Sequence, residues 1–332
     1  MPEPTGVLVI GDINESQLGS TSKELIAAGK GIADSLNETL SIALLGSSLA
    51  AIAQQAIEAG ADQVYSIDNP VLKTYHVELH LTALCTLIAE TTPRIVLMGR
   101  TVEGRELAPR LAFRLGVGLA QDCLEISMDT STGRLLANRP VYGGSAVAVV
   151  SCEQNPQIAA IRPKAYEALE SDTSRSGEII AFPIELNSSD IKTKVIDTVK
   201  EEAAGIKLED ARIVIAGGRG LGGPEPFADL QALADILGAG VGASRAAVDS
   251  GWVPYSYQVG LTGKTITPEI YITVAISGAS QHMAGCSGSK VIVAINKDSE
   301  ANIFKDAKYG VVGDWEAILP AFTESVRELT QN

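Results

Sequence analysis

The sequence predicts an α/β protein with two domains, and three observations support this prediction. Short β-branched runs alternate with longer amphipathic segments, which is typical of a mostly parallel sheet covered by helices on both faces. The length of 332 residues fits about two domains, each with its own core. The charged segment Glu201–Leu208 precedes the strongly apolar run Arg212–Ala216. We therefore expect domains at residues 1–204 and 205–332.

Strands and helices are expected to alternate through the first third of the chain. The predicted strands are short apolar runs, namely Gly6–Ile10, Leu40–Leu45, Val64–Ile67 and Arg94–Met98. The predicted helices carry apolar residues at spacings of three and four, namely Ser20–Leu36, Ser48–Ala59, Val71–Glu90 and Val102–Leu115. Ser20 or Thr21 is the expected N-cap of the first helix.

The pattern changes after Leu115. Four strand-like runs follow with turns between them and no room for helices: Cys123–Met128, Leu135–Pro140, Ser145–Ser151 and Gln157–Ile161. Strands joined by short turns pair in antiparallel fashion. We therefore expect an antiparallel appendage on the N-terminal α/β domain.

Composition excludes several classes of function. Forty acidic against 26 basic residues give a formal net charge of -14, which argues against nucleic acid or an anionic membrane as the main partner. The N-terminus has no signal-peptide pattern, and no apolar run approaches the roughly 18 residues that span a bilayer. The four cysteines are scattered without a CxxC pair, as is typical of buried thiols in a reducing compartment. We therefore expect a cytoplasmic protein.

Two features of the first domain resemble ligand sites. His76 and His80 stand four apart on a predicted helix, but no third ligand is near in sequence, so we expect no metal site. The segment Gly99–Glu106 places a helix start and two arginines after a strand, an arrangement that can hold a phosphate. An ordinary strand-to-helix connection with surface arginines is the favoured alternative.

The second domain is expected to open with a strand, a glycine-rich turn and a helix. Between the strand Arg212–Ala216 and the helix Phe227–Leu237, three glycines stand at the GxGxxG spacing: Gly218, Gly220 and Gly223. Such glycines let the backbone approach a pyrophosphate, and Arg219 adds a positive charge. The motif alone is weak evidence, because glycine-rich turns are common.

Two common nucleotide sites are disfavoured in this domain. An NAD site requires an acidic residue about 20 positions after the glycines, but Ser244 and Arg245 stand there, before the short predicted helix Ala246–Asp249. The segment Gln258–Thr265 contains GKT, yet Gln258 stands where a P-loop requires glycine.

The centre of the second domain is the segment Glu269–Asn296. The backbone N–H groups of Gly278–Gln281 are expected to lie unpaired at a helix start, where they attract anionic groups. His282 is the residue of this turn that ionises near neutral pH. The predicted elements around it are the strands Ile270–Ile276, Val291–Ile295 and Tyr309–Val312, the helical turn Ala279–Ala284, and a closing helix Trp315–Leu329 that Pro320 kinks or delays.

Five blocks of the last third of the chain occur in the order found in one family. They read GGRGL, GASRAAVDSGW, QVGLTGK, SGASQH and AINKD, and they strongly resemble the α subunit of electron-transfer flavoproteins. The resemblance implies a C-terminal, Rossmann-like, doubly wound domain that binds FAD. It also implies a β subunit that completes the site as a heterodimer, and an N-terminal domain with a structural and subunit-contact role.

The resemblance also implies roles for individual residues. Ser244 would contact the cofactor phosphates, Arg245 would lie beside the flavin ring, and Thr262 would hydrogen-bond near the redox-active nitrogen. His282 would approach the pyrimidine carbonyl and stabilise anionic flavin states. The full implied set of cofactor-binding residues is Gly218, Arg219, Gly220, Ser244, Arg245, Gln258, Val259, Gly260, Leu261, Thr262, Ser277, Gly278, Ala279, Ser280, Gln281, His282, Asn296 and Asp314.

Two positions of this set carry further implications. Many family members have glutamine where this chain has Leu261, so the flavin potential is the property most affected by this departure. Asn296 and Asp314 end successive predicted strands, and the resemblance assigns both to the adenosine half of FAD.

The function implied by the resemblance is electron transport. The chain would accept electrons from flavin dehydrogenases, such as the acyl-CoA dehydrogenases of fatty acid β-oxidation, or from NADH, and pass them to a redox acceptor protein. No catalytic residue is expected, because a carrier does no bond chemistry of its own. A variant is electron bifurcation with a second FAD in the β subunit. The alternatives of another class are an NAD-dependent dehydrogenase and a non-redox nucleotide-binding module.

Overall fold

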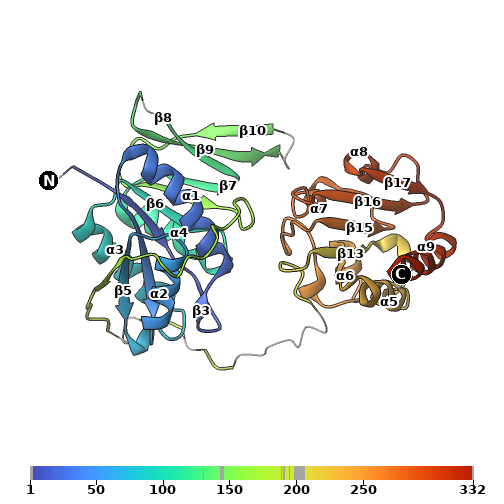
Figure 1. The fold of residues 1–332 in the computed structure, drawn as a ribbon, viewed down its shortest axis with the longest axis horizontal. Helices are drawn as coiled ribbons and strands as arrows, with labels where there is room; N and C mark the ends of the chain where they lie inside the picture. Colours follow the sequence, from blue (N-terminus) through green and yellow to red (C-terminus); the bar gives the residue numbers. More distant parts are fainter. Residues whose placement is uncertain are drawn as a thin grey trace. The chain divides into compact units, whose positions relative to one another are not determined.

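The computed structural model describes residues 3–129, 131–142, 146–187, 189, 191–193, 195–197 and 206–330. The chain forms two compact units, Met1–Asp197 and Thr198–Asn332, which we call unit 1 and unit 2 (Figure 1). Each unit is an α/β domain built on a parallel sheet, so the predicted fold class is confirmed. The predicted boundary between residues 204 and 205 lies outside the described residues and stays a prediction.

Unit 1 is organised around a seven-stranded sheet in which all neighbouring strands are parallel, in the order β12-β5-β4-β1-β6-β11-β7. The strands are β1 (Val7–Ile10), β4 (Leu40–Gly46), β5 (Gln63–Asp68), β6 (Ile95–Gly99), β7 (Leu119–Cys123), β11 (Gln157–Ile161) and β12 (Glu178–Ala181). The two faces carry separate apolar clusters. One face is covered by α1 (Ser20–Leu36) and α2 (Ala50–Glu58), and the other by α3 (Val77–Thr91) and α4 (Val102–Leu115).

A three-stranded antiparallel sheet lies along one side of unit 1 (Figure 1). It consists of β8 (Glu125–Asp129), β9 (Arg134–Val141) and β10 (Ala146–Val150), so the predicted appendage is confirmed for these runs. The assignment of Gln157–Ile161 to the appendage was wrong, because β11 pairs in parallel with β6 and β7. All five of its residues are buried, which is typical of a central parallel strand.

The ends of two predicted helices differ from the structure. Helix α1 spans the predicted residues, but its N-cap is Gly19 without a side-chain hydrogen bond, so the assignment of Ser20 or Thr21 was wrong. The long helix expected at Val71–Glu90 is divided into a 3-10 turn, η1 (Pro70–Leu72), and α3. The side chain of Asn69 accepts from the N–H of Val71 at 3.1 Å and caps the start of η1, and residues 73–76 lie between η1 and α3.

Unit 2 contains a five-stranded parallel sheet in the order β14-β13-β15-β16-β17. The strands are β13 (Ile213–Gly217), β14 (Gly240–Ala243), β15 (Ile270–Val274), β16 (Val291–Asn296) and β17 (Tyr309–Val312). Helices α5 (Phe227–Leu237) and α9 (Trp315–Thr330) contribute to the apolar cluster of one face, and the short helices α7 (Ser280–Met283) and α8 (Ile303–Asp306) to that of the other. Unit 2 is therefore doubly wound, as predicted.

The closing helix α9 does not have the delayed start that was one of the two effects expected of Pro320. It starts at Trp315 and contains Pro320 in its second turn, so a start delayed to Pro320 is wrong. The carboxylate of Asp314 accepts from the N–H of Glu316 at 3.1 Å and stabilises this early start.

In both units the strand order reverses beside the first strand. In unit 1, β1 lies between β4 and β6, and in unit 2, β13 lies between β14 and β15. In an open parallel sheet, the connections on either side of such a switch point diverge and leave a crevice at the carboxyl ends of the strands, where ligands bind.

Candidate functional site

The turns that follow the strands of unit 2 meet at one edge of its sheet, because the strands are parallel. The N–H of Gly218, after β13, donates to the carbonyl of Val274 at the end of β15 over 2.9 Å. The N–H of Ser244, after β14, donates to the carbonyl of Gly217 over 2.9 Å. The glycine-rich turn, the Ser244 turn and the end of β15 are thus hydrogen-bonded to one another.

Two glycines allow these turns to pack closely. A Cβ on Gly218 would lie 2.0 Å from the carbonyl oxygen of Ala275, and a Cβ on Gly278 would lie 2.2 Å from the backbone nitrogen of Ile303. Gly278 also has a φ of +76°, which disfavours any other residue. These two glycines are therefore required for the close packing of the protein's own turns at this edge.

Donor groups at this edge are unsatisfied. The N–H groups of residues 278–281 donate no hydrogen bond to any described residue, which agrees with the prediction of open donors at this turn. The hydroxyl oxygen of Ser244 is buried and has no hydrogen-bond partner among the described residues. A buried polar atom without a partner requires an explanation, and a phosphate oxygen is the kind of group that a hydroxyl and backbone N–H groups bind together.

The two predicted site arginines lie on the surface of unit 2. Arg245 is 67% exposed and forms an ion pair with Asp249, whose side chain is 62% exposed, at 3.2 Å. Arg219 is also exposed. Neither side chain is held against the converging turns, and the pairing of Arg245 with a surface carboxylate is an ordinary helix contact.

The loop from Gln258 to Lys264 closes against the same edge. The N–H of Val259 donates to Ala243 at the end of β14 over 2.9 Å, and the N–H of Leu261 donates to the carbonyl of Gln281 over 2.7 Å. The buried side chain of Gln258 donates to the hydroxyl of Thr262 over 2.9 Å. Gln258 therefore positions Thr262, which is a structural role in addition to the predicted cofactor contact.

His282 is buried beneath this loop. Its side chain is 7% exposed, and Nε2 lies 2.8 Å from the hydroxyl of Tyr271, which is fully buried. Burial raises the pKa of Tyr271 well above its ordinary value, so the hydroxyl stays protonated. Because the backbone carbonyl of Val259 lies near the ring and can only accept, we assign the hydroxyl of Tyr271 as the hydrogen-bond donor to Nε2. The ring proton of neutral His282 is then on Nδ1, which is buried and has no hydrogen-bond partner among the described residues.

The charge state of His282 differs from the interpretation of the sequence. Burial lowers its pKa to about 4, and the nearby carbonyl of Val259 opposes this shift without forming a hydrogen bond to Nδ1. The imidazole is thus neutral at pH 7 in this chain, so ionisation near neutral pH was wrong. Tyr271 was missed from the sequence; a tyrosine in an otherwise aliphatic buried strand was the available signal.

The two residues assigned to the adenosine half of FAD are partly used by the protein itself. The amide of Asn296 donates to the carbonyl of Ile276 over 2.9 Å and accepts from the N–H of Asp298 over 3.0 Å. These bonds hold the turn after β15. Asp314 follows the edge strand β17 and caps α9, three strands away from β13 in the sheet.

The converging turns therefore contain most of the predicted site. The structure brings together Gly218, Ser244, Val259, Gly260, Leu261, Gly278, Gln281, His282 and Asn296. Ser277, Ala279 and Ser280 are exposed in the same turn. Gly220 is also close, because a Cβ added to it would lie 3.0 Å from the Cβ of Ala275. Asp314 and the exposed arginines are the outlying members.

The Gly99–Glu106 segment and the histidine pair of unit 1 make ordinary structural contacts. Arg100 forms an ion pair with Asp122 at 3.3 Å, and the hydroxyl of Thr101 caps α4 by accepting from Gly104 at 3.2 Å. The Gly99–Glu106 segment thus resembles a common strand-to-helix connection. Nδ1 of His80 lies 3.0 Å from the carbonyl of His76, and the described residues contain no group of three potential metal ligands.

Two further sequence expectations can be compared with the described residues. None of their helices is both long and apolar enough to cross a bilayer. All four cysteines are free, but only Cys123 and Cys286 are buried, whereas Cys85 and Cys152 are partly exposed.

Comparison with known proteins identifies the family. Residues 7–187 match the model of the electron transfer flavoprotein domain, and residues 207–287 match that of the electron transfer flavoprotein FAD-binding domain. The chain is 43% identical to the electron transfer flavoprotein subunit alpha of Bacillus subtilis, over 97% of this chain and 98% of that protein. It is 40% identical to the protein of the same name from Thermoanaerobacterium thermosaccharolyticum, with the same coverage. It is 36% identical to the acryloyl-CoA reductase electron transfer subunit beta of Anaerotignum propionicum, over 95% of this chain and 93% of that protein.

The fold, the site and the comparisons all indicate the same family of proteins. Unit 2 is a doubly wound domain whose switch point carries open donors suited to a phosphate-bearing cofactor. The chain belongs to the electron transfer flavoprotein family and is an alpha subunit of that family.

Proposed function

We propose that this chain binds FAD at the switch-point edge of unit 2 and carries electrons between a donor and a redox acceptor protein. The observation that carries the proposal is the buried, unpartnered hydroxyl of Ser244 beside the open N–H groups of residues 278–281. These donors lie next to Gly218 and Gly278, where any side chain would collide with backbone. The open donors match the oxygens of a pyrophosphate, and the glycines allow the turns that carry these donors to pack together.

Bound FAD would supply the reversible one- and two-electron chemistry, and the residues of this chain bind and orient it. Ser244 and the turn at residues 278–281 would hold phosphate oxygens. The loop containing Leu261 and Thr262 would cover the ring, because hydrogen bonds anchor it to Ala243 and Gln281. His282 would act as a neutral donor through Nδ1, held in this tautomer by Tyr271.

A neutral donor changes how anionic flavin states would be stabilised. The buried imidazole has no positive charge at pH 7, so it would contribute a hydrogen bond and a dipole. A hydrogen bond to a charged group contributes roughly 1.5–3 kcal/mol. About 1.4 kcal/mol corresponds to about 59 mV for one electron, so this bond alone can raise the flavin potential by roughly 60–120 mV.

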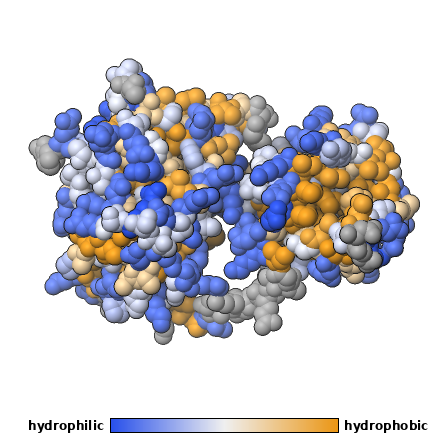
Figure 2. Space-filling view, in the orientation of Figure 1, coloured by the Kyte–Doolittle hydropathy of each residue, from blue (hydrophilic) through white to orange (hydrophobic). Residues whose placement is uncertain are grey.

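We also propose a β subunit as the partner that completes the site. Unit 1 exposes apolar side chains on and next to its antiparallel sheet: Val147 and Val149 on β10 are 59% and 63% exposed, and Tyr142, which follows β9, is 87% exposed. Figure 2 shows apolar side chains at the surface of both units. Exposed apolar side chains on neighbouring strands are typical of protein contacts.

The donors and the compartment are proposed on chemical grounds. One relative is named as an electron transfer subunit of acryloyl-CoA reductase, which supports flavoenzymes that act on acyl-CoA substrates, such as the dehydrogenases of fatty acid β-oxidation, as redox partners of this chain. The four free thiols agree with a reducing, cytoplasmic setting.

The affinity for FAD of a Ser244→Ala variant tests the proposed site. We expect the variant, purified with its β subunit, to bind FAD about tenfold more weakly, since one hydrogen bond to a charged group is lost. Ser250→Ala is the matched control, because the hydroxyl of Ser250 bonds within its own helix to Ala246. Equal loss of affinity in both variants, or none in Ser244→Ala, would remove Ser244 from the site.

A further inference from the structure

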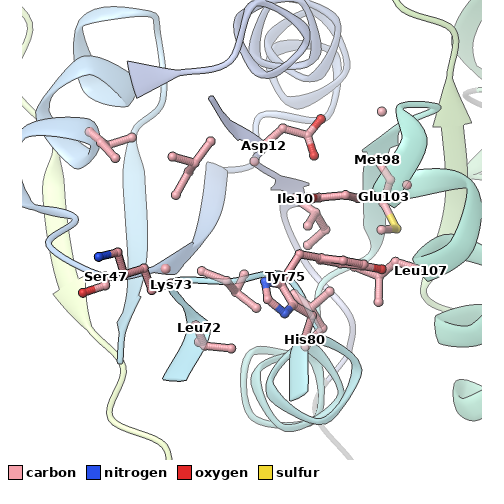
Figure 3. A pocket seen from close by; sticks show the side chains of 18 of the residues that line it. Ile10, Asp12, Ser47, Leu72, Lys73, Tyr75, His80, Met98, Glu103 and Leu107 are labelled. Atoms are coloured by element: carbon pink, nitrogen blue, oxygen red, sulfur yellow. The ribbon is translucent and has the colours of Figure 1, made fainter. Parts of the chain in front are cut away.

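Unit 1 contains a cavity of about 430 Å³ at the carboxyl ends of β1, β4 and β6 (Figure 3). This place is the switch point of the seven-stranded sheet, since β1 lies between β4 and β6. Its volume is within the range of small-molecule sites. Its walls combine polar and aliphatic groups, and the aliphatic side chains include Ile10, Leu45, Leu72, Leu84, Met98 and Leu107.

The carboxyl group of Asp12 lines this cavity without a partner for one of its oxygens. Oδ2 is buried and forms no hydrogen bond with any described residue. Burial raises the pKa of Asp12 to about 7, the negative charge of Glu103 adds to the shift, and the nearby side chain of Thr101 opposes it without forming a hydrogen bond to Oδ2. An unpaired buried carboxyl is costly in the folded chain, and a ligand that donates to it would remove this cost.

A second buried polar group presents a lone pair. His80 is 9% exposed and lines the cavity. Its Nδ1 lies 3.0 Å from the carbonyl of His76, which can only accept, so Nδ1 carries the proton and Nε2 is an acceptor. Nε2 forms no hydrogen bond with the described residues. The ring centroid lies 4.8 Å from that of Tyr75, whose hydroxyl donates to Glu106 over 3.4 Å.

The cavity therefore offers acceptors, and its surroundings disfavour anions. The helix start nearest to β4 is already occupied, because the N–H groups of Ser48 and Leu49 donate to Asp68 over 2.9 and 3.0 Å. Thr101 caps α4 in the same way. The acidic residues Glu15 and Glu103 line the cavity together with Asp12, against the single cation Lys73 among its lining residues. An anion such as phosphate would meet one lysine and a few serine hydroxyls against three carboxyl groups, so the net charge of the lining disfavours it.

We propose that this cavity binds a small organic cation, a protonated amine or amidine with a compact apolar body. Its N–H groups would meet Asp12 and His80, and its apolar part would lie against the aliphatic walls and the ring of Tyr75, where a cation is also attracted by the aromatic face. Figure 3 shows Asp12, Tyr75 and His80 around the same space. The proposal concerns unit 1 and does not rest on flavin binding in unit 2.

Binding of such a cation depends on pH through Asp12. The ionised carboxylate attracts the cation, so affinity rises with pH until Asp12 is fully ionised. The other groups that face the cavity are Glu15 in the turn between β2 (Ile13–Asn14) and β3 (Gln17–Leu18), Lys73 and Tyr75 before α3, His80 on α3 and Glu103 on α4. Burial lowers the pKa of His80, so His80 is neutral over this range.

The test compares three ligands of one shape: benzylamine, benzyl alcohol and benzoate. Calorimetric titration uses the full chain with its partner subunit, at pH 6 and pH 8. We expect saturable binding of benzylammonium, about tenfold tighter at pH 8 than at pH 6 because the ionised fraction of a group with a pKa of about 7 changes about tenfold. Benzyl alcohol and benzoate should bind at least about tenfold more weakly.

Matched variants separate this site from surface charge. Asp12→Asn should remove both the affinity and its pH dependence, whereas Asp34→Asn, at a side chain that is 63% exposed, should change neither. Glu103→Gln is a second variant at the exposed rim, and it should weaken benzylammonium binding and move the pH midpoint down. Tight binding of benzoate or inorganic phosphate, absence of saturable benzylammonium binding, or wild-type binding by both Asp12→Asn and Glu103→Gln would overturn the proposal.

Discussion

The buried carboxyl of Asp12 should make the stability of unit 1 depend on pH. Its pKa rises from an ordinary 3.8 to about 7, first because of burial and second because of the charge of Glu103. An acid with a raised pKa binds its proton more tightly in the folded chain, so the unfolding free energy falls as pH rises from about 4 toward 7. Between about pH 5 and pH 8 this loss amounts to about 3 kcal/mol. The substitution Asp12→Asn should abolish it.

Urea unfolding at several pH values measures this effect. The two tryptophans, Trp252 and Trp315, both lie in unit 2, so fluorescence follows unit 2 while hydrogen exchange of peptides from β1, β4 and β6 follows unit 1. Between about pH 5 and pH 8, we expect the unfolding free energy of unit 1, measured by hydrogen exchange, to fall by about 3 kcal/mol more in the wild type than in Asp12→Asn. The unfolding free energy of unit 2 should have the same pH dependence in both proteins. Asp34→Asn is the control for loss of an exposed carboxylate. Equal pH dependence in the wild type and Asp12→Asn would refute the reasoning.

Three further predictions concern unit 2. Tyr271→Phe should lower the unfolding free energy of unit 2 by about 1–2 kcal/mol, because buried Nε2 of His282 loses its donor. A urea unfolding curve, followed by tryptophan fluorescence, with the same midpoint as the wild type would contradict this. His282→Ala should lower the flavin potential by roughly 60–120 mV, the value of one hydrogen bond to a charged group, and an unchanged redox titration would disprove the role of this residue. Arg245→Ala should lower the potential in the same direction, and a smaller effect is expected than for His282, since Arg245 is 67% exposed and pairs with Asp249; a titration identical to the wild type would exclude it.

The fold was largely predictable because strand and helix patterns are local. In unit 2 the predicted strands β13, β15, β16 and β17 are present, since each is an apolar, mostly β-branched run. Strand β14, with the sequence GVGA, and the four-residue helix α8 were missed because they are short and carry little pattern. The misassignment of β11 has a physical cause. A buried strand reads the same in a parallel and an antiparallel sheet, and its partners are set by residues far away in sequence. Strand β12 was missed because its four residues pair only with β5 at the sheet edge and are mostly exposed.

The candidate site was predictable in location but less so in chemistry. The blocks around Gly218, Ser244 and Gly278 are contiguous in sequence, and the strand order brings them together. The neutral state of His282 depends on Tyr271 and on burial, which only the folded chain reveals. The same is true of Asp12, which sequence reasoning did not single out: a single aspartate after a strand carries no signal of an unpartnered oxygen.

The visible absorption spectrum of this chain purified with its β subunit tests the central claim most directly. The account predicts a flavin bound in unit 2 that is reduced and reoxidised stepwise. It also predicts that the dissociation constant for FAD is about tenfold higher in the Ser244→Ala protein than in the wild type. Two flavins per heterodimer, with NADH reducing both, would support the bifurcating variant of the same function. A complex without flavin, even after incubation with FAD, would contradict the proposed function.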